Sequence, residues 1–80
     1  MAELEEKNFK LVKQLLCDRL EIDSSEIQKE FRLKEDLGID SLDRFELLYA
    51  LEEELDIYIN EADIEKCETI EDVVNLISKY

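Results

Sequence analysis

The 80-residue sequence contains no proline, no histidine, no tryptophan and a single glycine. Turn-rich and all-β folds need more turn-forming residues than this, so the composition predicts a helical chain of the all-α class. A chain of this length makes one small domain, spanning residues 1–80, with a thin hydrophobic core. Such a core leaves little room for a deep active site, and we expect no catalytic residues.

Long apolar runs are missing as well. No stretch approaches the roughly 20 residues that a bilayer span needs, and the acidic start MAELEE lacks the basic and apolar regions of a signal peptide. We therefore expect a cytoplasmic protein that does not insert into membranes. The two cysteines, Cys17 and Cys67, have no C-x-x-C spacing and no histidine partner, so we interpret them as free, partly buried thiols and expect no metal site.

Helical periodicity and capping residues predict a small four-helix bundle with three longer helices and one short helix. The predicted helices span about Glu3–Leu20, Asp40–Leu55, Glu61–Lys66 and Ile70–Lys79. Asp40 and Asn60 are candidate N-caps, and Thr69 with Asp72 resembles a capping box. A long loop, residues 21–39, joins the first two helices; its recurring apolar residues predict that it is pinned to the core.

The 23 acidic residues outnumber the ten basic ones, which gives a net charge of −13. The excess lies in residues 35–72, which hold fifteen acidic and two basic side chains. Such a field repels phosphate backbones and attracts basic protein surfaces, so we expect protein partners and no nucleic acid. Solubility alone is the alternative explanation for an acidic surface.

Ser41 stands at the predicted start of the second helix, in the stretch DLGIDSL. A catalytic serine needs a base, usually histidine, and the chain has none. The segment also lacks the G-x-S-x-G elbow, which argues against a hydrolase. Neither Asp36–Glu46 nor Asp56–Glu65 has the ligand spacing of a calcium-binding EF-hand loop.

The second predicted helix has two apolar faces. At about 100° per residue, Leu47, Leu48, Leu51 and Leu55 form an ordinary core stripe. Leu42, Phe45 and Tyr49 point largely away from that stripe and are bordered by Glu46, Glu52 and Glu53. An apolar patch with a carboxylate rim is typical of a docking surface for a basic partner. Coverage of the patch by the long loop is the alternative.

The block DLGIDSLDRFELLYALEEELDIYI resembles the centre of an acyl carrier protein, and the predicted helices and loop match that family over nearly the whole chain. In that family the serine of the D-S-L motif carries 4′-phosphopantetheine through a phosphodiester. The resemblance therefore implies that Ser41 receives this covalent cofactor from coenzyme A, through a phosphopantetheinyl transferase that uses Mg²⁺. The thiol of the cofactor would then hold acyl groups as thioesters.

The resemblance also implies a set of contact residues. The positions that match the partner-contacting surface of the family are Asp40, Leu42, Asp43, Phe45, Glu46, Tyr49, Glu52 and Glu53. Candidate lining for a sheltered acyl chain is provided by Leu51, Leu55, Ile59 and Ile64, although core packing explains these four equally well. Arg44 departs from the family pattern, because a small or hydroxylated residue is usual there.

The function that the resemblance implies is a monomeric carrier of growing acyl chains for fatty acid biosynthesis. Its partners would be the transferase and basic-surfaced acyl-transferring or synthase enzymes. Two alternatives stay open. One is a specialised carrier for a polyketide, aminoacyl or lipid-modification pathway. The other is an unmodified acidic helical adaptor that uses the same patch.

Overall fold

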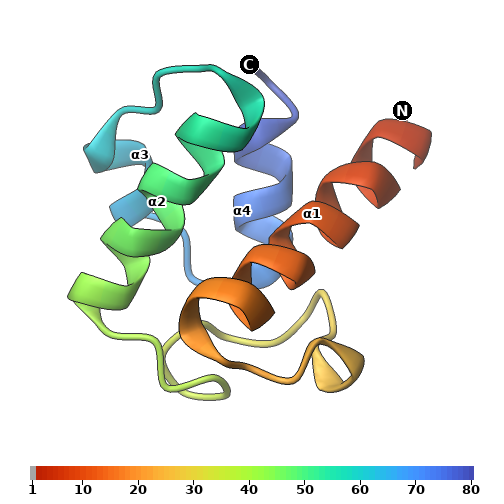
Figure 1. Cartoon of the computed structure of the whole chain (residues 1–80), viewed down its shortest axis with the longest axis vertical. Helices are drawn as coiled ribbons and strands as arrows, with labels where there is room; N and C mark the ends of the chain where they lie inside the picture. Colours follow the sequence, from red (N-terminus) through yellow and green to blue (C-terminus); the bar gives the residue numbers. More distant parts are fainter. Residues whose placement is uncertain (1) are drawn as a thin grey trace.

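The computed structural model describes residues 2–80 as a helical bundle (Figure 1). Its elements are α1 (Ala2–Leu20), the short 3₁₀ helix η1 (Ser24–Glu26), α2 (Ser41–Leu55), α3 (Glu61–Glu65) and α4 (Ile70–Ile77). The all-α class, with three longer helices and one short one, is confirmed. Across residues 2–80, no helix combines the length and the apolar character that crossing a membrane requires.

Capping explains where the helices begin and end. Asp40 precedes α2 with an extended backbone, and its Oδ1 accepts the N–H of Asp43 at 2.9 Å, so the helix starts at Ser41. The helix α4 ends at Ile77, two residues before the predicted end. The N–H groups of Lys79 and Tyr80 bond three residues back, which tightens the last turn into a 3₁₀ type and stops the α-helix.

The core lies where α1 packs against α2 and α4 (Figure 1). The side chains that are buried almost completely come from all four α-helices and from the connections between them, and include Val12, Leu16, Leu33, Ile39, Leu47, Leu48, Leu51, Ile59, Ile64, Ile70 and Val73. Both cysteines are free, but only Cys67 is buried, whereas Cys17 is exposed. The expectation of partly buried thiols is therefore wrong for Cys17.

The long loop between α1 and α2 is fastened to the segment that enters α4. The N–H of Leu33 donates to the carbonyl of Glu68 at 2.8 Å, and the N–H of Ile70 donates to the carbonyl of Phe31 at 3.0 Å. Arg32 and Thr69 thereby form an isolated antiparallel bridge. With Ile27, Leu33 and Ile39 buried, the loop is held to the core as predicted.

The first residues of α1 are joined to the end of the chain by a buried polar contact. Asn8 is the buried polar side chain of the core, and its Nδ2 donates to Ser78 Oγ at 2.9 Å. The Ser78 hydroxyl in turn donates to the carbonyl of Val74 at 2.7 Å. Because each of these groups has a partner, burying them costs little and fixes how α1 crosses α4.

The predicted capping box at the start of α4 is present. The Thr69 Oγ1 accepts the N–H of Asp72, while the Asp72 carboxylate accepts the N–H groups of Glu68 and Thr69 at 3.0 and 3.1 Å. These hydrogen bonds, with the Glu68 bond first, lower the pKa of Asp72 below its ordinary value of 3.8. The carboxylate therefore stabilises the fold in its charged form.

We expect Asp72→Asn to destabilise the protein at neutral pH by about 0.5–1 kcal/mol, near the low end for a cap because the carboxylate is exposed to solvent. A lowered pKa means that the contribution is present above pH 3.8 and is lost as the pH falls below that value. Chemical denaturation from neutral to acidic pH measures it. Glu71→Gln, which removes a charge from the same turn, is the control; equal effects of the two variants would contradict the assignment.

Candidate functional site

Ser41 is the first residue of α2, and its side chain is exposed. The preceding Ile39 is only 1% exposed and anchors the chain immediately before the serine. Asp40 then caps the helix through its own carboxylate. The serine is thus held at a fixed point on the surface by a buried anchor on one side and a helix on the other.

Gly38 shapes the turn that leads to this point. Its φ is +68°, in the left-handed region, where a residue with a Cβ costs about 1–2 kcal/mol. An added Cβ would meet nothing within 4 Å, so the backbone conformation, and not crowding, calls for glycine. The turn is closed by the N–H of Gly38, which donates to the carbonyl of Lys34 at 3.1 Å, and by that of Ile39, which donates to Leu33 at 2.8 Å.

The residues around Ser41 position its hydroxyl but do not activate it as a nucleophile. The start of a helix carries the positive end of its dipole, which favours an attached anion such as a phosphodiester. The Asp40 carboxylate is engaged with the N–H of Asp43, and the chain contains no histidine to take the hydroxyl proton. The serine can therefore receive a group only if another protein activates it.

The apolar patch predicted beside Ser41 is open to solvent. Leu42 is 78% exposed and Tyr49 is 56% exposed, while Phe45 is half-buried and also packs against the core. The long loop leaves Leu42 and Tyr49 uncovered, so the alternative of coverage does not hold for these two. Large apolar side chains this exposed are typical of a surface that another protein covers.

The predicted carboxylate rim divides into two groups. Asp40, Glu46 and Glu53 are exposed and Asp43 is half-buried, and all four lie on or directly before α2. Glu52 differs, because its Oε2 accepts the N–H of Ile59 at 2.8 Å and so holds the turn that follows the helix. The residues described here contain one ion pair, between Arg19 and Glu53 at 3.9 Å, in which the Glu53 side chain is largely exposed and the Arg19 side chain is partly covered.

Tyr49 also contacts α3. Its hydroxyl lies 3.4 Å from Glu61 Oε1, and the negative charge of Glu61 raises the pKa of Tyr49 above its ordinary value of 10.0. The hydroxyl therefore stays protonated and donates to the carboxylate. This contact holds the exposed ring across the gap between α2 and α3.

The four predicted acyl-lining residues lie in two places. Leu51, Ile59 and Ile64 are almost completely buried in the core. Leu55 is half-buried and lines a small cavity of about 160 Å³ together with Leu4, Asn8, Ile57, Ile77, Ser78 and Tyr80. The first three side chains serve packing in this state of the protein.

Arg44 makes a link that the helical pattern alone did not identify. Its Nη1 donates to the carbonyl of Glu65, the last residue of α3, at 2.8 Å. Its Nε is buried and has no hydrogen-bond partner among residues 2–80. An arginine that reaches a helix C-terminus places positive charge where the dipole is negative, so it ties α2 to α3.

Comparison with known proteins identifies the family to which this chain belongs. A family model described as the phosphopantetheine attachment site matches residues 10–77. An acyl carrier protein of Clostridium acetobutylicum is 46% identical over 72 residues, which cover 90% of this chain and 94% of that protein. The chain belongs to the acyl carrier protein family. A second member, from Campylobacter lari, is 46% identical over 69 residues, covering 86% of this chain and 90% of that protein.

The family extends to solved structures. A candidate acyl carrier protein from Mycobacterium tuberculosis superposes with a TM-score of 0.82 at 30% identity, covering 90% of this chain and 96% of that one. Membership confirms that this protein is a carrier and not an enzyme, and that its cofactor is covalently attached 4′-phosphopantetheine. When bound, this group supplies a thiol that holds acyl groups as thioesters. The exposed hydroxyl and helix start at Ser41 fit such a group.

The acidic residues between 35 and 72 are close together on a small protein, and one ion pair offsets them among residues 2–80. Repulsion between them opposes folding, and salt screens that repulsion. We therefore expect the melting temperature to rise when NaCl is increased from low to physiological concentration, and to rise further with Mg²⁺ at equal ionic strength. Calorimetry measures it; a melting temperature that is indifferent to salt would contradict the expectation.

Proposed function

We propose that this protein carries growing acyl chains, as thioesters on a 4′-phosphopantetheine arm attached to Ser41, for fatty acid biosynthesis in the cytoplasm. The observation that carries the proposal is the position of Ser41, exposed at the start of α2 and anchored by Ile39 and Asp40. The identity to acyl carrier proteins over most of the chain supports it.

Attachment requires one group transfer. The Ser41 Oγ forms a bond to the phosphorus that bears the pantetheine of coenzyme A, the pyrophosphate bond breaks, and adenosine 3′,5′-bisphosphate leaves. The hydroxyl proton passes to a base of the transferase, because the chain has no histidine and the Asp40 carboxylate next to Ser41 already accepts the N–H of Asp43. The resulting phosphodiester lies at the positive end of the α2 dipole, which favours its negative charge.

The partners of the carrier are the phosphopantetheinyl transferase and basic-surfaced acyl-transferring or synthase enzymes. Leu42 and Tyr49 supply exposed apolar contact area next to the attachment point. Glu46 and Glu53 supply exposed negative charge on the same helix. A surface with apolar contacts and a charged rim steers and then holds a partner of opposite charge, while Phe45 and Asp43 contribute their exposed edges.

Intact-mass spectrometry tests the attachment. We expect incubation with coenzyme A, Mg²⁺ and a promiscuous phosphopantetheinyl transferase to add a single pantetheinyl group, and Ser41→Ala to abolish the addition. Ser25→Ala is the matched control, because Ser25 is also exposed and also follows an aspartate cap, Asp23. A folded wild-type protein that gains no mass would contradict the proposal and favour the unmodified adaptor.

The partner surface is tested by charge removal. We expect Glu46→Gln combined with Glu53→Gln to slow modification by the transferase about tenfold at low salt, since rim charges act mainly on association rate. The control combines Glu3→Gln with Glu6→Gln, which removes two exposed carboxylates from α1. Equal slowing by both pairs would show that net charge, and not this surface, controls the encounter.

A specialised carrier is the second candidate function, and Arg44 is the observation that favours it. The family usually has a small or hydroxylated residue at position 44. Here the Arg44 guanidinium occupies that position on α2 and reaches the carbonyl of Glu65 on α3. Purified fatty acid elongation enzymes distinguish the two functions. Extension of an acyl group on this carrier supports the fatty acid role, whereas a modified protein that these enzymes do not extend supports the specialised one.

A further inference from the structure

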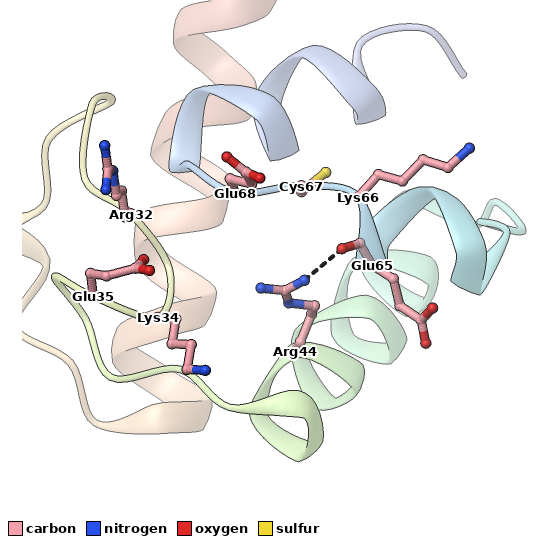
Figure 2. A pocket seen from close by; sticks show the side chains of 8 residues that line it. All are labelled: Arg32, Lys34, Glu35, Arg44, Glu65, Lys66, Cys67 and Glu68. Carbon is pink, nitrogen blue, oxygen red and sulfur yellow. Dashed lines mark hydrogen bonds between the residues drawn. The ribbon is translucent and has the colours of Figure 1, made fainter.

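A charged cleft lies between the loop before α2 and the connection from α3 to α4 (Figure 2). Its volume is about 500 Å³, and its lining residues are Arg32, Lys34, Glu35, Arg44, Glu65, Lys66, Cys67 and Glu68. A volume in this range is typical of a site for a small molecule. Cys67 contributes a thiol whose pKa is raised to about 11 by burial, so the thiol is neutral and unreactive.

The cleft has a local net charge of +1 on a protein whose net charge is −13. Four of its eight lining residues are cationic, out of ten basic residues in the whole chain, and three, Glu35, Glu65 and Glu68, are acidic. Over residues 2–80, none of these four cations has a carboxylate oxygen within 4.0 Å. Figure 2 shows Arg44 reaching from α2 to the carbonyl of Glu65, with Lys34 on the facing loop. Cations that the protein leaves without carboxylate partners are available to an external anion.

The cleft is adjacent to the attachment point. Arg44 lies on α2 three residues after Ser41, which is less than one helical turn, or roughly 4.5 Å along the axis. Cargo on an arm at Ser41 can therefore fold back into the cleft. The lining has seven charged residues and one cysteine, and an alkyl chain gains nothing from such contacts because its stabilisation comes from apolar burial.

We propose that this cleft binds the free carboxylate of a dicarboxylic acyl group carried on the arm, with Lys34 and Arg44, which face the same opening in Figure 2, as its cationic partners. The inference rests on the proposed attachment at Ser41 and specifies the class of cargo. A short acyl group that ends in a carboxylate matches both the charge of the cleft and its size. An uncharged acyl group of the same length has no partner there.

The direction in which the pKa of the cargo carboxyl shifts distinguishes cargo bound in the cleft from cargo that stays in solution. A carboxylate that stays in solution near a protein of charge −13 has its pKa raised by like-charge repulsion. A carboxylate that contacts the cations of the cleft has its pKa lowered. The two arrangements therefore shift the same group in opposite directions from its value on the free arm.

The experiment loads the apo-protein with succinyl-coenzyme A, ¹³C-labelled at the free carboxyl, through a promiscuous transferase. After intact mass confirms loading, ¹³C NMR follows the carboxyl titration and compares it with free succinyl-pantetheine. We expect a midpoint lower by about one pH unit, the low end for an opposite charge at short range. A midpoint equal to that of the free arm, or higher, would overturn the inference.

Two single variants locate the effect. Lys34→Gln should bring the midpoint back to or above that of the free arm, and the side chain is exposed, so the fold is preserved. Lys10→Gln removes the same charge from an exposed position outside the cleft and should leave most of the shift. Equal effects of the two variants would overturn the inference.

The mass measurement separates the two proposals. Absence of the succinyl-pantetheinyl mass from a folded protein would overturn attachment at Ser41 and the cleft assignment together. A complete mass gain with an unshifted midpoint would overturn the cleft assignment alone.

Discussion

The backbone hydrogen bonds between the long loop and the entry to α4 determine where the functional residues lie. They join Leu33 to Glu68 and Phe31 to Ile70, two segments more than thirty residues apart in the sequence. With the loop fastened there, Ile39 reaches the core and the chain turns at Gly38 into α2. The same pairing forms one wall of the charged cleft. A thin core is sufficient because the loop contributes to it.

The distribution of acidic side chains opposes folding but favours association with a basic partner protein. Residues 35–72 carry the excess of acidic side chains, and the exposed surface of α2 presents part of it beside an uncovered leucine and tyrosine. Under the proposed function, a partner that covers the patch offsets the repulsion between these charges, since apolar burial and charge complementarity then act together.

Local signals in the sequence predicted most of the secondary structure. Asp40, Asn60 and Thr69 cap helices as expected, because a cap depends on residues two or three positions away. The loop pairing joins distant segments through backbone atoms, so no side-chain pattern reports it. The Glu52 contact with Ile59 likewise depends on the path of a turn that the sequence does not specify.

Part of the geometry of the candidate site was predicted from the sequence. Exposure of Leu42 and Tyr49 followed from the helical angle, and the position of Ser41 followed from the cap. Arg44 left a signal that could have been read: at about 100° per residue it falls at roughly 200°, within the core stripe of α2, where an arginine needs a partner. The partner itself, a carbonyl of α3, required the three-dimensional packing.

The contact between Asn8 and Ser78 brings the start of α1 and the end of the chain to the same end of the bundle, while α2 begins at the opposite end (Figure 1). A fused domain, tag or surface tether at either end would therefore extend away from the serine. A carrier tethered at either terminus would therefore keep the proposed attachment point at Ser41 accessible to its partners.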